Sequence, residues 1–129
     1  MAKTARTIGL LHEELSYQII GCAQKVHGVL GPGFPESVYQ RALSREFVNS
    51  QIPFQAQQSF EVSYEGLPCG QFRVDFFVDE RIIVELKAVD NLCKQHEAQV
   101  LAYLKATNCH IGLLFNFSDV SLRQKRLVL

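Results

Sequence analysis

Two acidic residues and a lysine near the middle of the sequence have the types and spacing of a metal-dependent hydrolytic site. Asp75 precedes Glu85 by ten positions, and Lys87 follows Glu85 by two. Carboxylate oxygens are hard ligands that suit Mg²⁺ or Mn²⁺. A lysine beside them could orient a water molecule or stabilise negative charge on a phosphate. An ExK triplet is common by chance, so this chemistry requires a fold that brings the two acids together.

The residues between the two acids predict a β-hairpin that meets this requirement. Strands are expected over residues 67–78 and 82–88, with a turn at 79–81. An odd-numbered loop centred on Glu80 would place Asp75 opposite Glu85, with their Cβ atoms about 5 Å apart. A two-residue loop would instead pair Asp75 with Val84 and put the carboxylates on opposite faces. The odd loop pairs apolar residues with one another, so the hydrophobic pattern favours it.

Side chains on a strand alternate between faces, which divides the hairpin into an apolar and a polar side. The polar side would carry Arg73, Asp75, Glu85 and Lys87. On these residues alone, a metal site and an ordinary solvated strand face are equally good interpretations. The apolar side is expected to hold Phe72, Val74, Phe76 and Val78 from the first strand, and Ile82, Val84 and Leu86 from the second.

The elements around the hairpin predict an α/β fold with the order α-α-β-β-β-α-β. Apolar residues recur at helical spacing over residues 14–30 and 35–49, and a strand pattern covers 54–64. After the hairpin, Asp90 or Asn91 could cap a helix that runs to Thr107, and residues 111–117 form a buried strand. A mixed four-stranded sheet flanked by helices is expected, in which the last strand lies parallel to the third.

Two of the predicted helices carry further candidate residues. His96, Gln99 and Tyr103 form one stripe on the helix after the hairpin, which could border the acidic face. By the helix pattern alone, a partly buried tyrosine with polar neighbours is the simpler interpretation. Glu36 and Tyr39 share a face at the start of the second helix, where the helix dipole by itself would favour an acid.

Composition limits the class of protein. With 47% hydrophobic and 20% charged residues, the chain has an ordinary globular composition, and we expect one domain over 1–129 with flexible ends at about 1–13 and 124–129. Thirteen basic residues balance thirteen acidic ones, which weakens a role in nucleic-acid binding through bulk charge.

No apolar run could span a membrane. Free thiols in a reducing cytoplasm best explain the scattered cysteines Cys22, Cys69, Cys93 and Cys109.

Taken together, the motifs resemble the GxxExxY proteins, a branch of the PD-(D/E)xK nuclease superfamily. The signature is residues 33–39 (GFPESVY), and the resemblance extends over nearly all of the chain from about Leu15. Val74 stands where the superfamily often has proline before the motif aspartate, a departure that the superfamily tolerates. The matching segments that follow the signature are 72–75 (FRVD), 84–88 (VELKA), 96–99 (HEAQ), 103–105 (YLK), 112–117 (GLLFNF) and 125–126 (KR).

This resemblance implies a restriction-endonuclease-like core and a role for each motif residue. Asp75 and Glu85 would bind the metal with the Leu86 carbonyl, and Lys87 would be the catalytic lysine. Glu36 would be an extra acid of the site and a possible further metal ligand. The motif of Gln99 and Tyr103 matches the QxxxY element of RecB-like nucleases, which borders the active site; Tyr39, His96 and Arg73 are further bordering candidates.

The resulting functional hypothesis is a Mg²⁺- or Mn²⁺-dependent nuclease that hydrolyses nucleic acid with a metal-activated water, with DNA favoured over RNA as the substrate. A second hypothesis, which the neutral charge and small size favour, is a nucleic-acid-binding or assembly module that keeps the fold without turnover. A third is a phosphoesterase that acts on a small nucleotide. A homodimer through the apolar residues near Phe54, Phe60 and Tyr64 would enlarge the surface available to a duplex.

Overall fold

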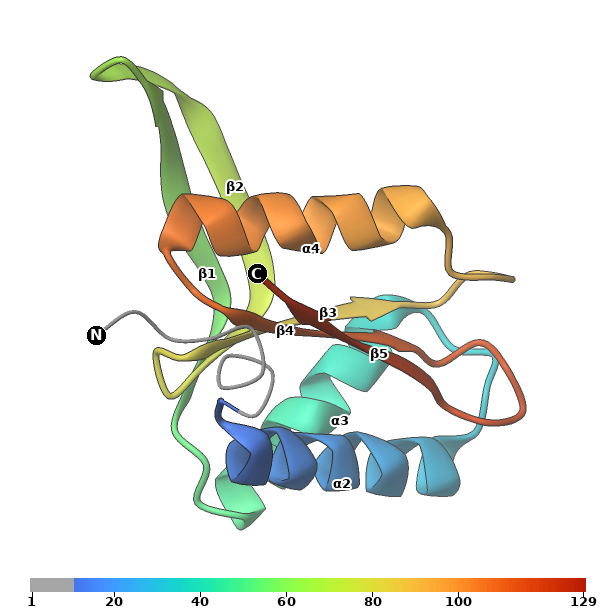
Figure 1. Cartoon of the computed structure of the whole chain (residues 1–129). Helices are drawn as coiled ribbons and strands as arrows, with labels where there is room; N and C mark the ends of the chain where they lie inside the picture. The colour runs from blue at the N-terminus through green and yellow to red at the C-terminus, as the bar shows by residue number, and fades with distance from the viewer. Residues whose placement is uncertain (1–10) are drawn as a thin grey trace.

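A five-stranded mixed sheet forms the centre of the computed structural model, with helices on both faces (Figure 1). The structure describes residues 11–129. Residues 1–10, most of the amino-terminal segment predicted to be flexible, lie outside that part. Helices α2 (Glu13–Leu30) and α3 (Glu36–Asn49) cover one face, and α4 (Lys94–Thr107) covers the other. None of the described helices combines the length and apolar character that a membrane crossing requires.

Local sequence explains where the helices begin and end. Gly31 follows α2 with a φ of 68°, which a glycine adopts without steric cost. Pro35 has a φ of −64° and directly precedes the first turn of α3. The start predicted for α4, at Asp90 or Asn91, is wrong: Cys93 caps the helix, and its backbone N–H donates to Nδ1 of His96.

The strands run in sequence order across the sheet, and β3 and β4 are parallel, as the crossover through α4 predicted. All other neighbours are antiparallel. The bounds are Phe54–Tyr64 for β1, Leu67–Val78 for β2, Ile82–Lys87 for β3, Ile111–Asn116 for β4 and Arg123–Val128 for β5.

The fifth strand corrects the predicted sheet of four strands and the predicted flexible end at 124–129. Strand β5 pairs with β4 along its whole length, from Asn116–Arg123 to Ile111–Val128. Leu127 is buried, and Lys125 forms a 3.1 Å ion pair with Glu97 of α4. A mostly charged and polar sequence is compatible with a strand here because β5 lies at the sheet edge, where charge discourages pairing with other chains.

The core consists of two layers, one on each face of the sheet. Between the sheet and helices α2 and α3 lie Ile19, Leu43, Phe47, Phe76 and Val84, among others. The layer under α4 is smaller and contains Val74, Ile83, Val100, Leu104 and Leu114.

The predicted apolar face of β2 is wrong at two of its four residues. Phe76 and Val78 pack toward α2 and α3 as predicted, but Val74 and Phe72 pack on the opposite face, under α4. Regular alternation would have kept all four together. The alternation is broken at Asp75, opposite the point where β1 contains Gln57 with a φ of 53°.

Gly112 allows α4 to approach β4 closely. A Cβ atom at this position would lie 2.6 Å from Cγ1 of Val100. We expect Gly112→Ala to lower the free energy of unfolding by about 1–3 kcal/mol, because the helix must shift to accommodate the methyl group. Urea denaturation measures the change. The control is Gly28→Ala on α2, where nothing lies within 4 Å and the substitution should be neutral or stabilising. Equal stability of Gly112→Ala and the wild type would contradict this packing.

Candidate functional site

The turn between β2 and β3 sets the register that the site depends on. Val78 pairs with Ile82, and Phe76 pairs with Val84, so the loop has three residues centred on Glu80. This confirms the predicted odd-numbered loop. Continuing the same register brings Asp75 opposite Glu85.

The two carboxylates occupy the gap where β2 and β3 separate. Ladder pairing ends at Phe76 and Val84, one residue before the acids. The Asp75 backbone N–H donates to Oε1 of Glu85 at 2.9 Å, and the Leu86 N–H donates to Oδ2 of Asp75 at 2.7 Å. Each carboxylate is therefore fixed by the backbone of the opposite strand. The N–H and C=O of a strand residue point to the same edge, so the Leu86 carbonyl also faces this gap.

Glu85 is buried, with only 5% of its surface exposed, and this burial strongly affects the protonation of its carboxyl group. This burial, and after it the negative charge of Asp75, raise the pKa of Glu85 from an ordinary 4.5 to about 8. Without a bound cation, the Glu85 carboxyl therefore holds a proton at neutral pH. Ionisation of both carboxylates would be opposed by their mutual repulsion, which a metal ion bound between them would offset.

Lys87 is held at the end of β3 through both its side chain and its backbone. Its Nζ donates to Oε1 of Gln99 on α4 at 3.1 Å, and its carbonyl oxygen accepts a 2.9 Å hydrogen bond from the Phe117 N–H. The structure thus brings Gln99 to the lysine of the candidate site.

Tyr103, one turn beyond Gln99 on α4, also lies at this site. Its ring stacks on Phe72 of β2 with centroids 4.4 Å apart and an interplanar angle of 13°. Partial burial raises the pKa of Tyr103 above its usual 10, and the charges of Glu85 and Asp75 raise it further. The Tyr103 hydroxyl is therefore close enough to Asp75 and Glu85 for their negative charges to affect its pKa.

A family model described as the PD-(D/E)XK nuclease superfamily matches residues 13–127, which include all of α2 to β4 and all but the last residue of β5. The chain belongs to the PD-(D/E)XK nuclease superfamily. No curated protein matches the sequence significantly.

Two solved structures resemble this PD-(D/E)XK protein. The crystal structure of SSO0001 has a TM-score of 0.58 and 16% identity over 91% of this chain, which shows a shared fold. This chain spans 58% of that protein's length. An alkaline exonuclease (LHK-Exo) from Laribacter hongkongensis has a TM-score of 0.44 and 11% identity, over 99% of this chain and 72% of the exonuclease.

Among the other predicted site residues, Glu36 and Arg73 are both exposed. Glu36 lies in the first turn of α3, where its charge complements the helix dipole. Within residues 11–129 no group of three or more His, Cys, Asp or Glu side chains is placed to share a metal ion, so the structure does not bring Glu36 to the Asp75–Glu85 pair. Arg73 lies on β2 and pairs with Ser59 of β1.

Tyr39 and His96 both have contacts that explain them structurally. Tyr39 is fully buried, stacks on Phe117 at 4.5 Å, and donates its hydroxyl to the Gly31 carbonyl at 2.6 Å. It therefore joins the α2–α3 connection to the core. His96 accepts a hydrogen bond at the start of α4 and so caps this helix of the PD-(D/E)XK fold.

The sequence interpretation missed Asn116, which organises the segment after Lys87. This buried amide donates to the Val89 carbonyl at 2.8 Å and accepts from the Val89 N–H at 3.1 Å. It ties the end of β4 to the chain leaving β3. A signal was present in the sequence: Asn116 is the one polar residue within the apolar run 111–117.

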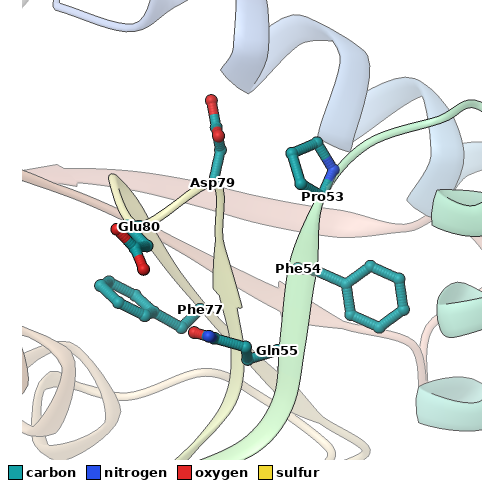
Figure 2. Close-up of a pocket in the computed structure, with 6 residues that line it drawn as sticks. All are labelled: Pro53, Phe54, Gln55, Phe77, Asp79 and Glu80. Carbon is teal, nitrogen blue, oxygen red and sulfur yellow. The ribbon is translucent and has the colours of Figure 1, made fainter.

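A separate cavity of about 230 Å³ lies at the turn between β2 and β3 (Figure 2). Asp79 and Glu80 are the charged residues that line it, beside Gln55 and the ring of Phe77. An acidic lining repels a phosphate backbone. The acids of this cavity are also not those of the Asp75–Glu85 pair, so we do not assign nucleic-acid chemistry to it.

Proposed function

We propose that this PD-(D/E)XK protein is a Mg²⁺-dependent nuclease that hydrolyses phosphodiester bonds in DNA. The observation that carries the proposal is the meeting of Asp75 and Glu85 in the gap between β2 and β3, with Lys87 two residues further along β3 and hydrogen-bonded to Gln99. The charge of Lys87 acts on Glu85 and lowers its pKa, against the larger effects that raise it. The choice of DNA follows from the resemblance to RecB-like nucleases.

The donor set fits the proposed metal. Mg²⁺ is usually held by one or two carboxylates, with water and substrate phosphate completing its ligands. Asp75, Glu85 and the Leu86 carbonyl would supply three oxygens from the protein. The raised pKa of Glu85 is consistent with this fit, because a bound cation would offset both the burial and the repulsion that raise it.

Each residue has a distinct proposed role. Asp75 and Glu85 would hold the metal, which when bound polarises a phosphoryl oxygen and lowers the pKa of water. The Lys87 ammonium, held by Gln99, would orient the attacking water and stabilise negative charge on the phosphate. Tyr103 would border the scissile group from α4.

The direct test is cleavage of labelled single-stranded DNA, double-stranded DNA and RNA. We expect cleavage of DNA with Mg²⁺ or Mn²⁺ and complete loss of cleavage with excess EDTA, because the carboxylate pair needs a cation to act. Absence of cleavage above an Asp75→Asn control on every substrate would overturn the enzymatic proposal. Cleavage of RNA alone would change the substrate but keep the mechanism.

The zero net charge favours a second candidate, a nucleic-acid-binding or assembly module without turnover. Strand β1 lies at the sheet edge, and Tyr64 near its end is 68% exposed, so pairing with a second copy is a way to enlarge the binding surface. Calorimetric titration with Mn²⁺ separates the candidates, because a pure binding module does not need metal at Asp75 and Glu85.

A further inference from the structure

Gln57 has an unusual backbone conformation for a residue inside a strand. Its φ is 53°, in the left-handed region that is unfavourable for residues other than glycine, asparagine and aspartate. Six other non-glycine residues in the described part have positive φ, and all of them lie at turns or helix ends. Strain of this kind persists only where the surrounding structure imposes it, and it is common near functional sites.

The position of Gln57 in the sheet links this strain to the acidic pair. Ala56 pairs with Phe76 and Gln58 pairs with Val74, but the pairing between them is interrupted. The residues that the register would place opposite each other at the interruption are Gln57 and Asp75. The irregular backbone therefore lies directly across from one carboxylate of the candidate site.

Packing on the two sides of the interruption shows its effect on β1 and β2. Before it, Phe54 and Phe76 meet edge to face at 5.7 Å on the α3 side of the sheet. Beyond it, Phe60 stacks on Phe72 at 5.5 Å, and Phe72 stacks on Tyr103 of α4. Phe54 and Phe76 therefore lie on the α3 face of the sheet, whereas Phe60 and Phe72, beyond the kink, lie on the α4 face.

Hydrogen bonds at the interruption fix Asp75 from both neighbouring strands. Nε2 of Gln57 donates to Oδ1 of Asp75 at 3.3 Å, while the Leu86 N–H donates to Oδ2 at 2.7 Å. The Asp75 N–H is directed at the Glu85 side chain on β3. Both oxygens of the Asp75 carboxylate therefore have a donor, one on β1 and one on β3.

We propose that Gln57 is a positioning residue of this site. The left-handed backbone of Gln57 on β1 bends the neighbouring strand β2 at Asp75, so that the Asp75 side chain reaches the gap beside β3. The side-chain amide of Gln57 then holds the Asp75 carboxylate in place. The inference rests on the proposed function only in taking Asp75 as a metal ligand. Groups that orient a ligand in this way typically change metal affinity 10- to 100-fold when removed.

The experiment compares Gln57→Ala and Gln57→Gly with the control Gln51→Gly. Gln51 is also an exposed glutamine with positive φ, 57°, but it lies in the turn after α3. Amide hydrogen exchange in the metal-free protein reports on Leu86, whose N–H is bonded to Asp75, with Phe117 as the reference amide. Calorimetry then measures Mn²⁺ affinity, and thermal denaturation measures Tm.

We expect exchange at Leu86 to become about tenfold faster in both Gln57 variants, with Phe117 unchanged. Mn²⁺ affinity should fall about tenfold. The Tm of Gln57→Gly should stay at or above the wild-type value, because glycine relieves the strained backbone. Gln51→Gly should leave both the exchange at Leu86 and the affinity unchanged.

Two results would overturn the inference. One is wild-type exchange at Leu86 in Gln57→Ala, which would show that the amide does not hold Asp75. The other is parallel acceleration at Leu86 and Phe117 with a lower Tm, which would reduce Gln57 to a general contribution to stability. If exchange at Leu86 responds as expected but the wild type cleaves no nucleic acid, the positioning role stands and the nuclease proposal fails.

Discussion

The Asp75→Asn variant should lose about 10³-fold in kcat/KM for DNA cleavage with Mg²⁺. Asparagine keeps the volume of the side chain and can still accept the hydrogen bond from the Leu86 N–H. It removes one of the two negative charges that would hold the cation. A loss of 10³-fold corresponds to about 4 kcal/mol of transition-state stabilisation, which is typical when an electrostatic group of an active site is removed. Initial rates over a range of oligonucleotide concentrations measure the change.

The matched control for this substitution is Asp79→Asn, in the turn that follows β2. Asp79 lies in the turn with a φ of 51°, which asparagine accepts readily, and its ion pair with Arg81 is at the surface. Its activity should equal that of the wild type. If Asp75→Asn cleaves at the same rate as Asp79→Asn, the Asp75 carboxylate has no part in the reaction.

The hydrophobic pattern was sufficient to predict the part of the site that depends on register. Only an odd loop pairs Val78 with Ile82 and Phe76 with Val84, and the same pairing brings Asp75 opposite Glu85. A shift of one residue would have moved every apolar side chain of β3 to the wrong face. The position of the two acids was therefore fixed by their apolar neighbours.

The pattern failed where a single residue departs from regular strand geometry. Placing Phe72 and Val74 beside Phe76 assumed that β2 alternates without interruption, whereas the chain changes faces at Asp75. The cause lies on another strand, at Gln57, and glutamine has no intrinsic preference for positive φ that could have signalled it. Only the tertiary structure shows the kink.

Strand β5 was missed for a different reason. Arg123, Lys125 and Arg126 give it the composition of a solvated tail, and Leu127 is its one buried residue. An edge strand buries little apolar area and carries charges that prevent pairing with other chains, so its sequence resembles that of an irregular segment. Asn116, in contrast, was visible in the sequence as a polar residue in an apolar run.

Glu85→Gln should raise the stability of the metal-free protein at high pH. The pKa of Glu85 is about 8 in the folded protein and is expected near 4.5 in the unfolded chain. Between these values the folded state binds one more proton than the unfolded state, so stability falls as pH rises from 4.5 to 8. Glutamine has no such titration and can still accept the hydrogen bond from the Asp75 N–H.

Urea denaturation with EDTA at pH 5 and pH 9 measures this difference. The free energies of unfolding should be similar at pH 5, and at pH 9 the variant should exceed the wild type by on the order of 3 kcal/mol. The control Glu61→Gln, on the exposed part of β1, should follow the wild type at both pH values. An equal pH dependence in Glu85→Gln and the wild type would show that Glu85 is not the group responsible.

Addition of Mn²⁺ in place of EDTA should reverse the order of stability at pH 9. In the wild type, binding at the ionised pair stabilises the folded state with the logarithm of metal concentration, by about 1.4 kcal/mol for each tenfold increase above Kd. Glu85→Gln lacks one of the two charges and should gain little. Glu85 would then both destabilise the metal-free protein and allow the metal to stabilise it, as expected where a buried charge is retained for function. Equal stabilisation of both proteins by Mn²⁺ would place the metal elsewhere.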